Sequence, residues 1–477
     1  QEDTRELRLA LALRGGASMA VWIGGAVCEV DRLRRATGST ADQDSVWAGL
    51  ARLAGYDSFA IDVLAGASAG GLNAALLTAS LVYGQSFERT RRMWVRLADI
   101  EAMARKTPAF WQPRPDSLLE GDDYFRRELV EVLAEGGSGP GGAPGRVDLL
   151  LTATLLDPAV VRYFDGRDDP VLERRRRAMF RFRHLGRPGD PLSDFGTGEQ
   201  FQESVLRLAH AARTTSSYPF AFEPAQVHSA PGKPPAGEPN MLGFFSESSA
   251  SPQAVPFRVV DGGVLDNIPV TAAVKAIAEA PADRPTDRLL LYLNPDPAVS
   301  RGQRPAGWSI PVAAAAVRAR FSRESLLTDI KALDEHNRAA ERAQLRRQAI
   351  FAPVHSADPG HRAAVLAEQA RAAAVENSRV RAELDAQAVH RLLTEPAGAE
   401  DGTLLPPVAG DPLHGWSAAA RSRLPERLAR VLTEAADPEL FGDVHGLRAA
   451  VHECLGWVWD IERSAVDPGL GSCKAAL

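Results

Sequence analysis

The chain has 477 residues, of which 45% are hydrophobic and 24% charged, and its formal net charge at pH 7 is −6. This composition is typical of a folded soluble protein and excludes general disorder. The negative net charge argues against a nucleic-acid-binding protein. No apolar run approaches the roughly 18 residues that a membrane-spanning helix needs.

The first 85 residues contain two units of strand, glycine-rich turn and helix. Leu7–Leu13 is a short apolar run that predicts a buried strand, and helical spacing follows over about residues 17–35. Phe59–Leu64 predicts a second strand, Gly66–Gly70 (GASAG) a turn, and Leu72–Tyr83 an apolar helix. This alternation predicts an α/β fold around a mostly parallel sheet.

Three more strands are expected further along the chain. They are the short apolar runs Val147–Thr154, Phe257–Val260 and Leu289–Leu293. The intervening segment Gly232–Ser251 is rich in Pro, Gly and Ser, which predicts a mobile loop, a lid or a hairpin.

The character of the sequence changes after about Arg301. Strand signals almost disappear, and four segments are rich in helix-forming residues: Val312–Phe351, His361–Leu393, Trp416–Ala436 and Val444–Ile461. We therefore expect a first domain over residues 1–300 and a mostly helical domain over residues 301–477. Because isolated amphipathic helices are marginal in water, the second domain is expected to pack on the first.

Ser68 is the strongest candidate for a reactive side chain. It lies in a G-x-S-x-G motif between a predicted strand and a predicted helix, which is the context of a nucleophile elbow. The helix N-terminus favours negative charge close to this serine. The motif alone is weak, because a plain strand–helix turn with a serine N-cap has the same letters.

A base for Ser68 is sought among the later residues. His184 and His228 lie in polar or helical surroundings without a strand-end context, so both are expected to be surface residues. Asp261 ends a predicted strand and precedes Gly262 and Gly263, which suits a carboxylate that faces a neighbouring loop. The alternative is an aspartate that only fixes its own turn.

Gly15 and Gly16 follow the first predicted strand and precede a helix. Backbone N–H groups in such a loop can bind an anion, either an oxyanion in acyl transfer or a phosphate. The G-x-G-x-x-G pattern of a dinucleotide site is absent, and no metal-ligand spacing occurs in the sequence. We therefore expect neither a cofactor nor a metal.

These three motifs, in this order, resemble the patatin-like phospholipase family. Asp261 through Asn267 and Pro269 match the family's D-G-G-x-x-x-N-x-P segment, and Ala211–Pro224 resembles the Ser- and Pro-rich segment before it. Gly15, Gly16 and Gly24 fall on the family's first glycine-rich loop. The resemblance covers roughly residues 7–297.

Membership in this family implies a three-layer α/β/α domain and a Ser–Asp dyad that works without histidine. By that resemblance Ser68 is the nucleophile, Asp261 is the base, and the N–H groups of Gly15, Gly16 and Ala69 form the oxyanion hole. The order and composition of the C-terminal region also resemble actinobacterial patatin-related proteins that carry an extra helical domain.

The first loop departs from the family pattern at three positions. Arg14 stands where the family has the first of three glycines, and Ser18 and Met19 replace an Arg-Gly pair. Because arginine adopts a positive φ only at a cost, we expect the first turn of the loop to differ.

The resemblance predicts a serine lipid acyl hydrolase that acts on carboxylic esters through an acyl-serine intermediate. One alternative is an acyltransferase or cyclase with the same dyad, and another is a non-catalytic module that holds an acyl chain. The expected partner is a lipid or another acyl ester, without nucleic acid. The sequence starts without Met or an apolar signal region, so a trimmed, cytoplasmic protein is expected, with a cleaved signal peptide as the alternative.

Peripheral membrane contact is suggested by one further segment. The run Arg174–Arg177 leads into Phe180 and Phe182, which alternate with arginines. Such a run can contact anionic lipid headgroups. An ordinary edge strand with one solvated face has the same pattern.

Overall fold

The chain is described by a computed structural model that divides it into two compact units. The first comprises residues 1–159, 174–331 and 399–406, and the second comprises 160–173, 332–398 and 407–477. The described residues are 5–16, 19–37, 45–97, 99–106, 117–135, 137, 145–163, 171–186, 193–229, 235–242, 244, 256–280, 286–295, 326–358, 360–365, 367–368, 382–384, 386–387, 389–390, 413 and 415–435.

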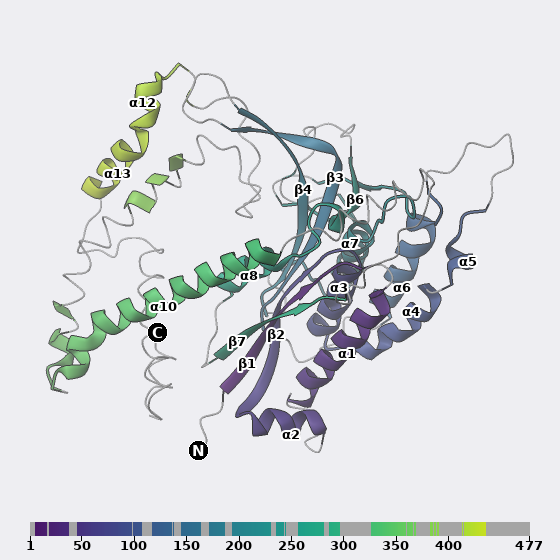
Figure 1. Ribbon diagram of the computed structural model, residues 1–477, viewed down its shortest axis with the longest axis horizontal. Helices are drawn as coiled ribbons and strands as arrows, with labels where there is room; N and C mark the ends of the chain where they lie inside the picture. The colour runs from purple at the N-terminus through teal and green to yellow at the C-terminus, as the bar shows by residue number, and fades with distance from the viewer. Residues whose placement is uncertain are drawn as a thin grey trace. The chain divides into compact units, whose positions relative to one another are not determined.

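A seven-stranded sheet in the order β5-β6-β3-β2-β1-β7 organises the first unit, with β4 paired to β3 (Figure 1). The pairs β1–β2, β1–β7 and β2–β3 are parallel, whereas β6 runs antiparallel to β3 and β5. The strands are β1 (Arg5–Leu13), β2 (Tyr56–Gly66), β3 (Val147–Tyr163), β4 (Val171–His184), β5 (Ala225–Val227), β6 (Phe257–Asp261) and β7 (Thr286–Leu293).

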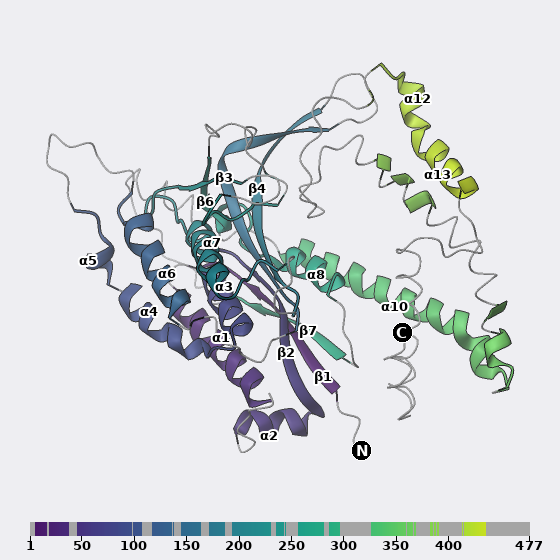
Figure 2. The same ribbon diagram turned by 180° about the vertical axis from the view of Figure 1, so that it is seen from behind.

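Helices cover both faces of this sheet, as the two opposite views show (Figures 1 and 2). α1, α3 and α7 lie on one face and α8 lies on the other. The helices before β7 are α1 (Ala20–Ala36), α2 (Val46–Leu53), α3 (Ser68–Val82), α4 (Arg91–Leu97), α5 (Ile100–Met103), α6 (Arg127–Ala134), α7 (Glu199–Thr215) and α8 (Val270–Ala278), with single turns η2 (Phe87–Thr90), η3 (Gly121–Arg126) and η4 (Gly262–Val264).

The alternation of side chains along β1 explains the two layers. Leu9, Leu11 and Leu13 join the main hydrophobic core with residues of α1 and α3. The intervening Ala10 and Ala12 are also buried and point to the other face, where their small size leaves room for α8. All fifteen residues of α3 are buried, so this helix lies at the centre of the unit. Its N-terminal residue, Ser68, is therefore held in a well-packed position.

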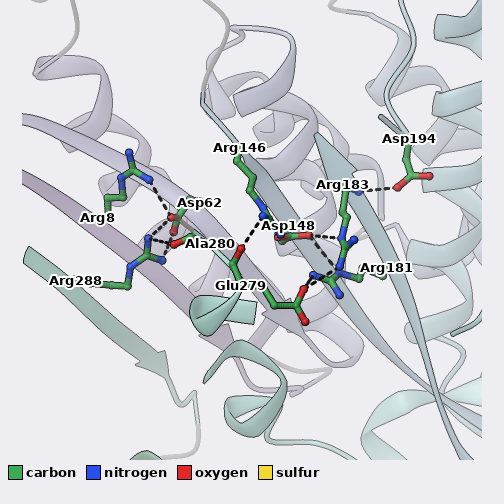
Figure 3. A network of polar contacts seen from close by, with 10 residues as sticks. All are labelled: Arg8, Asp62, Arg146, Asp148, Arg181, Arg183, Asp194, Glu279, Ala280 and Arg288. Atoms are coloured by element: carbon green, nitrogen blue, oxygen red, sulfur yellow. Dashed lines mark hydrogen bonds and ion pairs between the residues drawn. The ribbon is translucent and has the colours of Figure 1, made fainter. Parts of the chain in front are cut away.

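The C-terminal end of α8 is tied to the sheet by arginines and buried carboxylates (Figure 3). Arg288 of β7 donates two hydrogen bonds to Asp62 of β2, at 3.1 and 2.7 Å, and a third to the carbonyl of Ala280 at 3.3 Å. Burial raises the pKa of Asp62, while Arg288 and Arg8 oppose that rise. Arg288 also complements the negative end of the helix dipole.

A second cluster in the same view surrounds Asp148, a fully buried residue at the start of β3 (Figure 3). Its carboxylate accepts hydrogen bonds from Arg146 at 2.9 and 2.7 Å, from Arg181 at 3.3 Å and from Arg183 at 3.2 Å. Arg181 and Arg183 also bind the carboxylate of Glu279, which caps α8, at 2.6 and 2.9 Å. Strands β3 and β4 are thereby fastened to α8.

Asp148→Asn is expected to lower the free energy of unfolding by roughly 3–5 kcal/mol, because three arginines would lose their buried carboxylate. Urea denaturation at pH 7 would measure the loss. The matched control is Asp157→Asn on the same strand, since Asp157 pairs with Arg258 in the open, at 63% and 58% side-chain exposure. The control should leave the urea midpoint unchanged. Equal midpoints for the two variants would show that the Asp148 cluster does not stabilise the fold.

The predicted α/β class with a mostly parallel central sheet is confirmed, and each predicted strand is present with longer bounds. The arginine-rich segment that was considered for lipid contact forms strand β4, and its side chains alternate between two faces. Phe180 and Phe182 are core residues, whereas Arg181 and Arg183 bind Asp148. Among the described residues, every element after β7 is a helix: α10 (Leu326–Ser356), α12 (Ala418–Ser422) and α13 (Leu424–Ala435). The expected helix Val444–Ile461 and most of His361–Leu393 lie outside the described residues, as does residue 301.

Candidate active site

Ser68 stands at the turn where β2 ends and α3 begins, as the motif predicted. Its φ is +51°, in the left-handed region that a residue with a side chain enters only at a cost. Gly70 allows this tight turn, because a Cβ there would lie 2.3 Å from the carbonyl oxygen of Leu13. The strained turn therefore depends on close contact between α3 and the end of β1.

The hydroxyl of Ser68 donates a hydrogen bond of 2.6 Å to Oδ2 of Asp261. Sheet register explains how residues so far apart in sequence meet. Gly66 pairs with Leu151 of β3, and Asp261 pairs with Ala153, two residues further along the same strand. The two predicted candidates are thus neighbours at one edge of the sheet.

The Asp261 carboxyl group is completely buried, and that burial raises its pKa to about 7. Two hydrogen bonds limit the rise: the one from Ser68 and one of 2.8 Å from the N–H of Gly263 to Oδ1. A carboxyl group with a pKa near neutrality can both accept and return a proton under physiological conditions.

The end of α7 and the following turn hold the Ser68–Asp261 pair in place. The N–H of Ser68 donates to Oγ1 of Thr215 at 3.1 Å, and Oγ of Ser216 donates to the carbonyl of Ser68 at 3.1 Å. The N–H of Asp261 donates to the carbonyl of Ser217 at 3.0 Å. Both members of the pair are therefore positioned by one short segment.

The glycine loop after β1 lies directly against Ser68. A Cβ on Gly15 would lie 2.8 Å from Cβ of Ser68 and 2.3 Å from Oδ1 of Asn267, so only glycine fits. The N–H of Gly15 donates to that same Oδ1 at 3.1 Å. Gly15 is therefore engaged by Asn267. Ala69 lies in the first turn of α3, where N–H groups lack an intrahelical acceptor.

Arg14 does not adopt a positive φ, in keeping with its cost for arginine. Its N–H donates to the carbonyl of Leu293 at 3.1 Å, which extends the hydrogen bonding between β1 and β7 by one residue. Its guanidinium donates to Oδ1 of Asn294 at 2.9 Å. Met19 is the N-cap of α1, whereas Ser18 lies outside the described residues.

No histidine in the described part of the chain hydrogen-bonds to Ser68 or Asp261. His210 is buried in α7 with Nδ1 3.5 Å from Glu238. His184, which was expected at the surface, is buried at 8% exposure because its ring packs beside Phe195, and it contacts Ser193 at 3.4 Å. Within the same residues, no group of three or more His, Cys, Asp or Glu side chains could hold a metal ion. None of the helices described is both long enough and apolar enough to cross a membrane.

The family model of patatin-like phospholipases matches residues 11–274, which contain the glycine loop, Ser68 and Asp261. The chain belongs to the patatin-like phospholipase family. The described fold agrees with this assignment, and members of the family are generally hydrolytic, as esterases or phospholipases.

Beyond the patatin-like region, residues 330–477 match the model of a protein family of unknown function (DUF3376). A relative of this patatin-like chain, an uncharacterized membrane protein of Mycobacterium tuberculosis, is 31% identical over 328 residues. The match covers 61% of this chain and 28% of the relative. The chain thus spans under a third of the relative's length.

Sequence reasoning did not single out three contacts in the patatin-like site. Thr215 and Ser216 bind the backbone of Ser68, and Asn267 binds Gly15. A signal was present for the first two, since Thr214–Ser217 is a run of four hydroxyl residues. The sequence motif includes Asn267 but does not indicate what its side chain binds, because its partner, Gly15, is 252 residues away in the sequence.

Proposed function

We propose that the chain is a serine acyl hydrolase that cleaves carboxylic esters of lipids through an acyl-Ser68 intermediate. The observation that carries this proposal is the 2.6 Å hydrogen bond from the hydroxyl of Ser68 to a buried carboxylate within a patatin-like domain. The positive φ of Ser68 supports it, since strained backbone is concentrated at functional sites.

In the first half of the reaction, Oγ of Ser68 attacks the ester carbonyl while Asp261 accepts the hydroxyl proton. A tetrahedral oxyanion forms. It collapses by breaking the bond to the alcohol oxygen, and Asp261 returns the proton to that leaving group. The products of this half are a free alcohol and an ester of Ser68.

In the second half, water replaces Ser68 as the nucleophile. Asp261 accepts a proton from the attacking water and returns it to Oγ of Ser68 as the acyl bond breaks. The carboxylic acid leaves, and the Ser68–Asp261 hydrogen bond forms again. A base with a pKa near 7 is suited to both directions of transfer.

The N–H groups of Gly16 and Ala69 are the donors that we assign to the oxyanion, each with a contribution of roughly 3–4 kcal/mol. Gly15 was expected to be a third. Its N–H group already donates to Asn267 and would have to break that hydrogen bond to reach the oxyanion. We therefore assign Gly15 a steric role: because it has no side chain, the loop can approach Ser68 closely.

A fluorophosphonate probe tests this proposal, because it reacts only with an activated serine. We expect peptide mass spectrometry to find the label on Ser68 in the wild-type chain and none in Ser68→Ala. A chain that does not label would instead be a non-catalytic acyl-binding module. Hydrolysis is distinguished from acyl transfer by measuring the free acid released from p-nitrophenyl butyrate in water, since a transferase would release it only poorly without its acceptor.

A further inference from the structure

Two non-glycine residues in the described part of the chain have a positive φ, and they are Ser68 and Phe220. The φ of Phe220 is +69°. For a bulky residue this conformation is a true outlier that carries backbone strain. The other described residues in this region are glycines. The chain therefore keeps an aromatic residue where glycine would fit without strain.

Phe220 belongs to the turn that holds the active site. It lies four residues after Ser216, whose hydroxyl binds the carbonyl of Ser68, and three after Ser217, whose carbonyl binds Asp261. Four residues of chain span at most roughly 14 Å. Phe220 therefore lies within roughly 14 Å of Ser216, on the turn whose first residues bind Ser68 and Asp261.

Hydrogen bonds and ion pairs form a clamp that holds both ends of this turn. The buried Arg213 donates to Oγ of Ser217 at 2.6 Å and to the carbonyl of Glu223 at 2.9 Å. The Glu223 carboxylate accepts bonds from Ser117 at 2.9 Å and from Arg105 at 3.0 Å. Burial would raise the pKa of Glu223, but the hydrogen bonds it accepts outweigh burial and lower it to about 2. The clamp can therefore sustain the strain at Phe220.

The same clamp places a second apolar residue beside the first. The N–H of Leu118 donates to the carbonyl of Phe220 at 3.2 Å, and Leu119 donates to Ala221 at 2.8 Å. Leu118 is 71% exposed and Phe220 is 66% exposed. Neither side chain contributes to the core, so packing within the fold does not explain either one. We call this pair the apolar rim.

We propose that the apolar rim, Phe220 and Leu118, binds the acyl chain of a substrate presented at the surface of a lipid aggregate. This inference rests on the proposed function. An exposed apolar pair on the turn that binds Ser68 and Asp261, and on the segment hydrogen-bonded to it, fits an aliphatic chain, because contact removes apolar surface of both from water. A short ester in solution has no chain long enough to use the rim.

Phe220→Gly tests the proposal, since it removes the ring and also relieves the left-handed strain. We expect an unchanged or higher melting temperature. Activity on p-nitrophenyl palmitate in mixed micelles should fall roughly tenfold to a hundredfold, the effect of burying one large apolar side chain. Activity on soluble p-nitrophenyl butyrate should stay within about twofold. Phe220→Leu should recover most of the palmitate activity, because it keeps an apolar side chain.

The matched control is Leu53→Ser. Leu53 is 86% exposed and ends α2, just before β2, whereas Ser68 follows the opposite end of β2. This variant should hydrolyse both esters at the wild-type rate. Equal losses on both esters in Phe220→Gly, or no loss on palmitate, would overturn the proposal.

A readout independent of turnover separates failure of the rim from failure of the proposed function. Ser68→Ala, with and without Phe220→Gly, would be sedimented with phosphatidylcholine vesicles. We expect the glycine variant to bind roughly tenfold more weakly, even if the chain proves not to hydrolyse esters. Equal sedimentation would overturn the rim, whereas a missing fluorophosphonate label on Ser68 would overturn the hydrolase.

Discussion

Ser68→Ala is expected to lower kcat for p-nitrophenyl butyrate by at least about 10⁴-fold, because the acyl group would have no oxygen to bond to. The fold should survive. Alanine can occupy the same turn at similar strain, and the surrounding hydrogen bonds to the backbone of Ser68 do not use its hydroxyl. Steady-state kinetics and thermal unfolding of the same preparation would measure both effects.

The matched control for this variant is Ser80→Ala. Ser80 is also a buried serine of α3, but its hydroxyl donates only to the carbonyl of Leu76, at 3.0 Å. It should retain wild-type kinetics. Activity of Ser68→Ala above about a tenth of the wild-type value would mean that another residue is the nucleophile.

Asp261→Asn is expected to lower kcat/KM roughly 10²–10⁴-fold, because the amide keeps the shape of the side chain but cannot accept the proton of Ser68. In the wild-type enzyme kcat/KM should rise with pH and level off above about 7, where the carboxyl group is ionised. The residual activity of the variant should lack this ionisation. A pH profile from 5 to 9 would measure both.

The stability of the wild-type protein has a pH dependence of opposite sign to its activity. The Asp261 carboxyl group has a pKa of about 7 when folded and an ordinary value of 3.8. Between these values the folded chain binds a proton that the unfolded chain does not, so its contribution to stability falls as pH rises, by roughly 4 kcal/mol in all. Asn cannot ionise, and above pH 7 the variant should be more stable than the wild type.

These two effects distinguish loss of a base from loss of the fold. An Asp261→Asn variant that is inactive yet more stable at pH 8 is the expected result. If it were instead fully active while a single His→Ala variant such as His210→Ala abolished activity, the Ser–Asp pair would be the wrong assignment.

Much of the patatin-like site could be predicted because its key residues carry local signals. Ser68 lies in a motif with glycines that the close approach to β1 requires, and Asp261 ends a short apolar run before two glycines. Both signals come from backbone geometry, which a few neighbouring residues determine. The expectation that Asp261 faces a neighbouring loop came from its place at a strand end before two glycines.

Other parts of the site could not be predicted, because they depend on partners distant in sequence. Nothing near Phe220 in the sequence indicates a positive φ, and the turn that contains it is held by hydrogen bonds among Arg213, Glu223 and Ser117. The bond from Gly15 to Asn267 likewise needs the complete fold. Helix α8 was not predicted from the sequence; it is only nine residues long, and its C-terminal end binds Arg146, which is far from it in the sequence, and Arg288, which belongs to another element.

The place of β1 within the sheet has a consequence for synthesis of the protein. The first strand of the chain lies between β2 and β7, and Glu6 contacts Thr286, a residue 280 positions later (Figure 1). At ribosomal rates of about 5–20 residues per second, one edge of β1 waits roughly 15–60 s for its neighbour. During that time an apolar strand with unpaired N–H and C=O groups is open to other chains. That edge of β1 therefore stays open to pairing with other chains until β7 has left the ribosome.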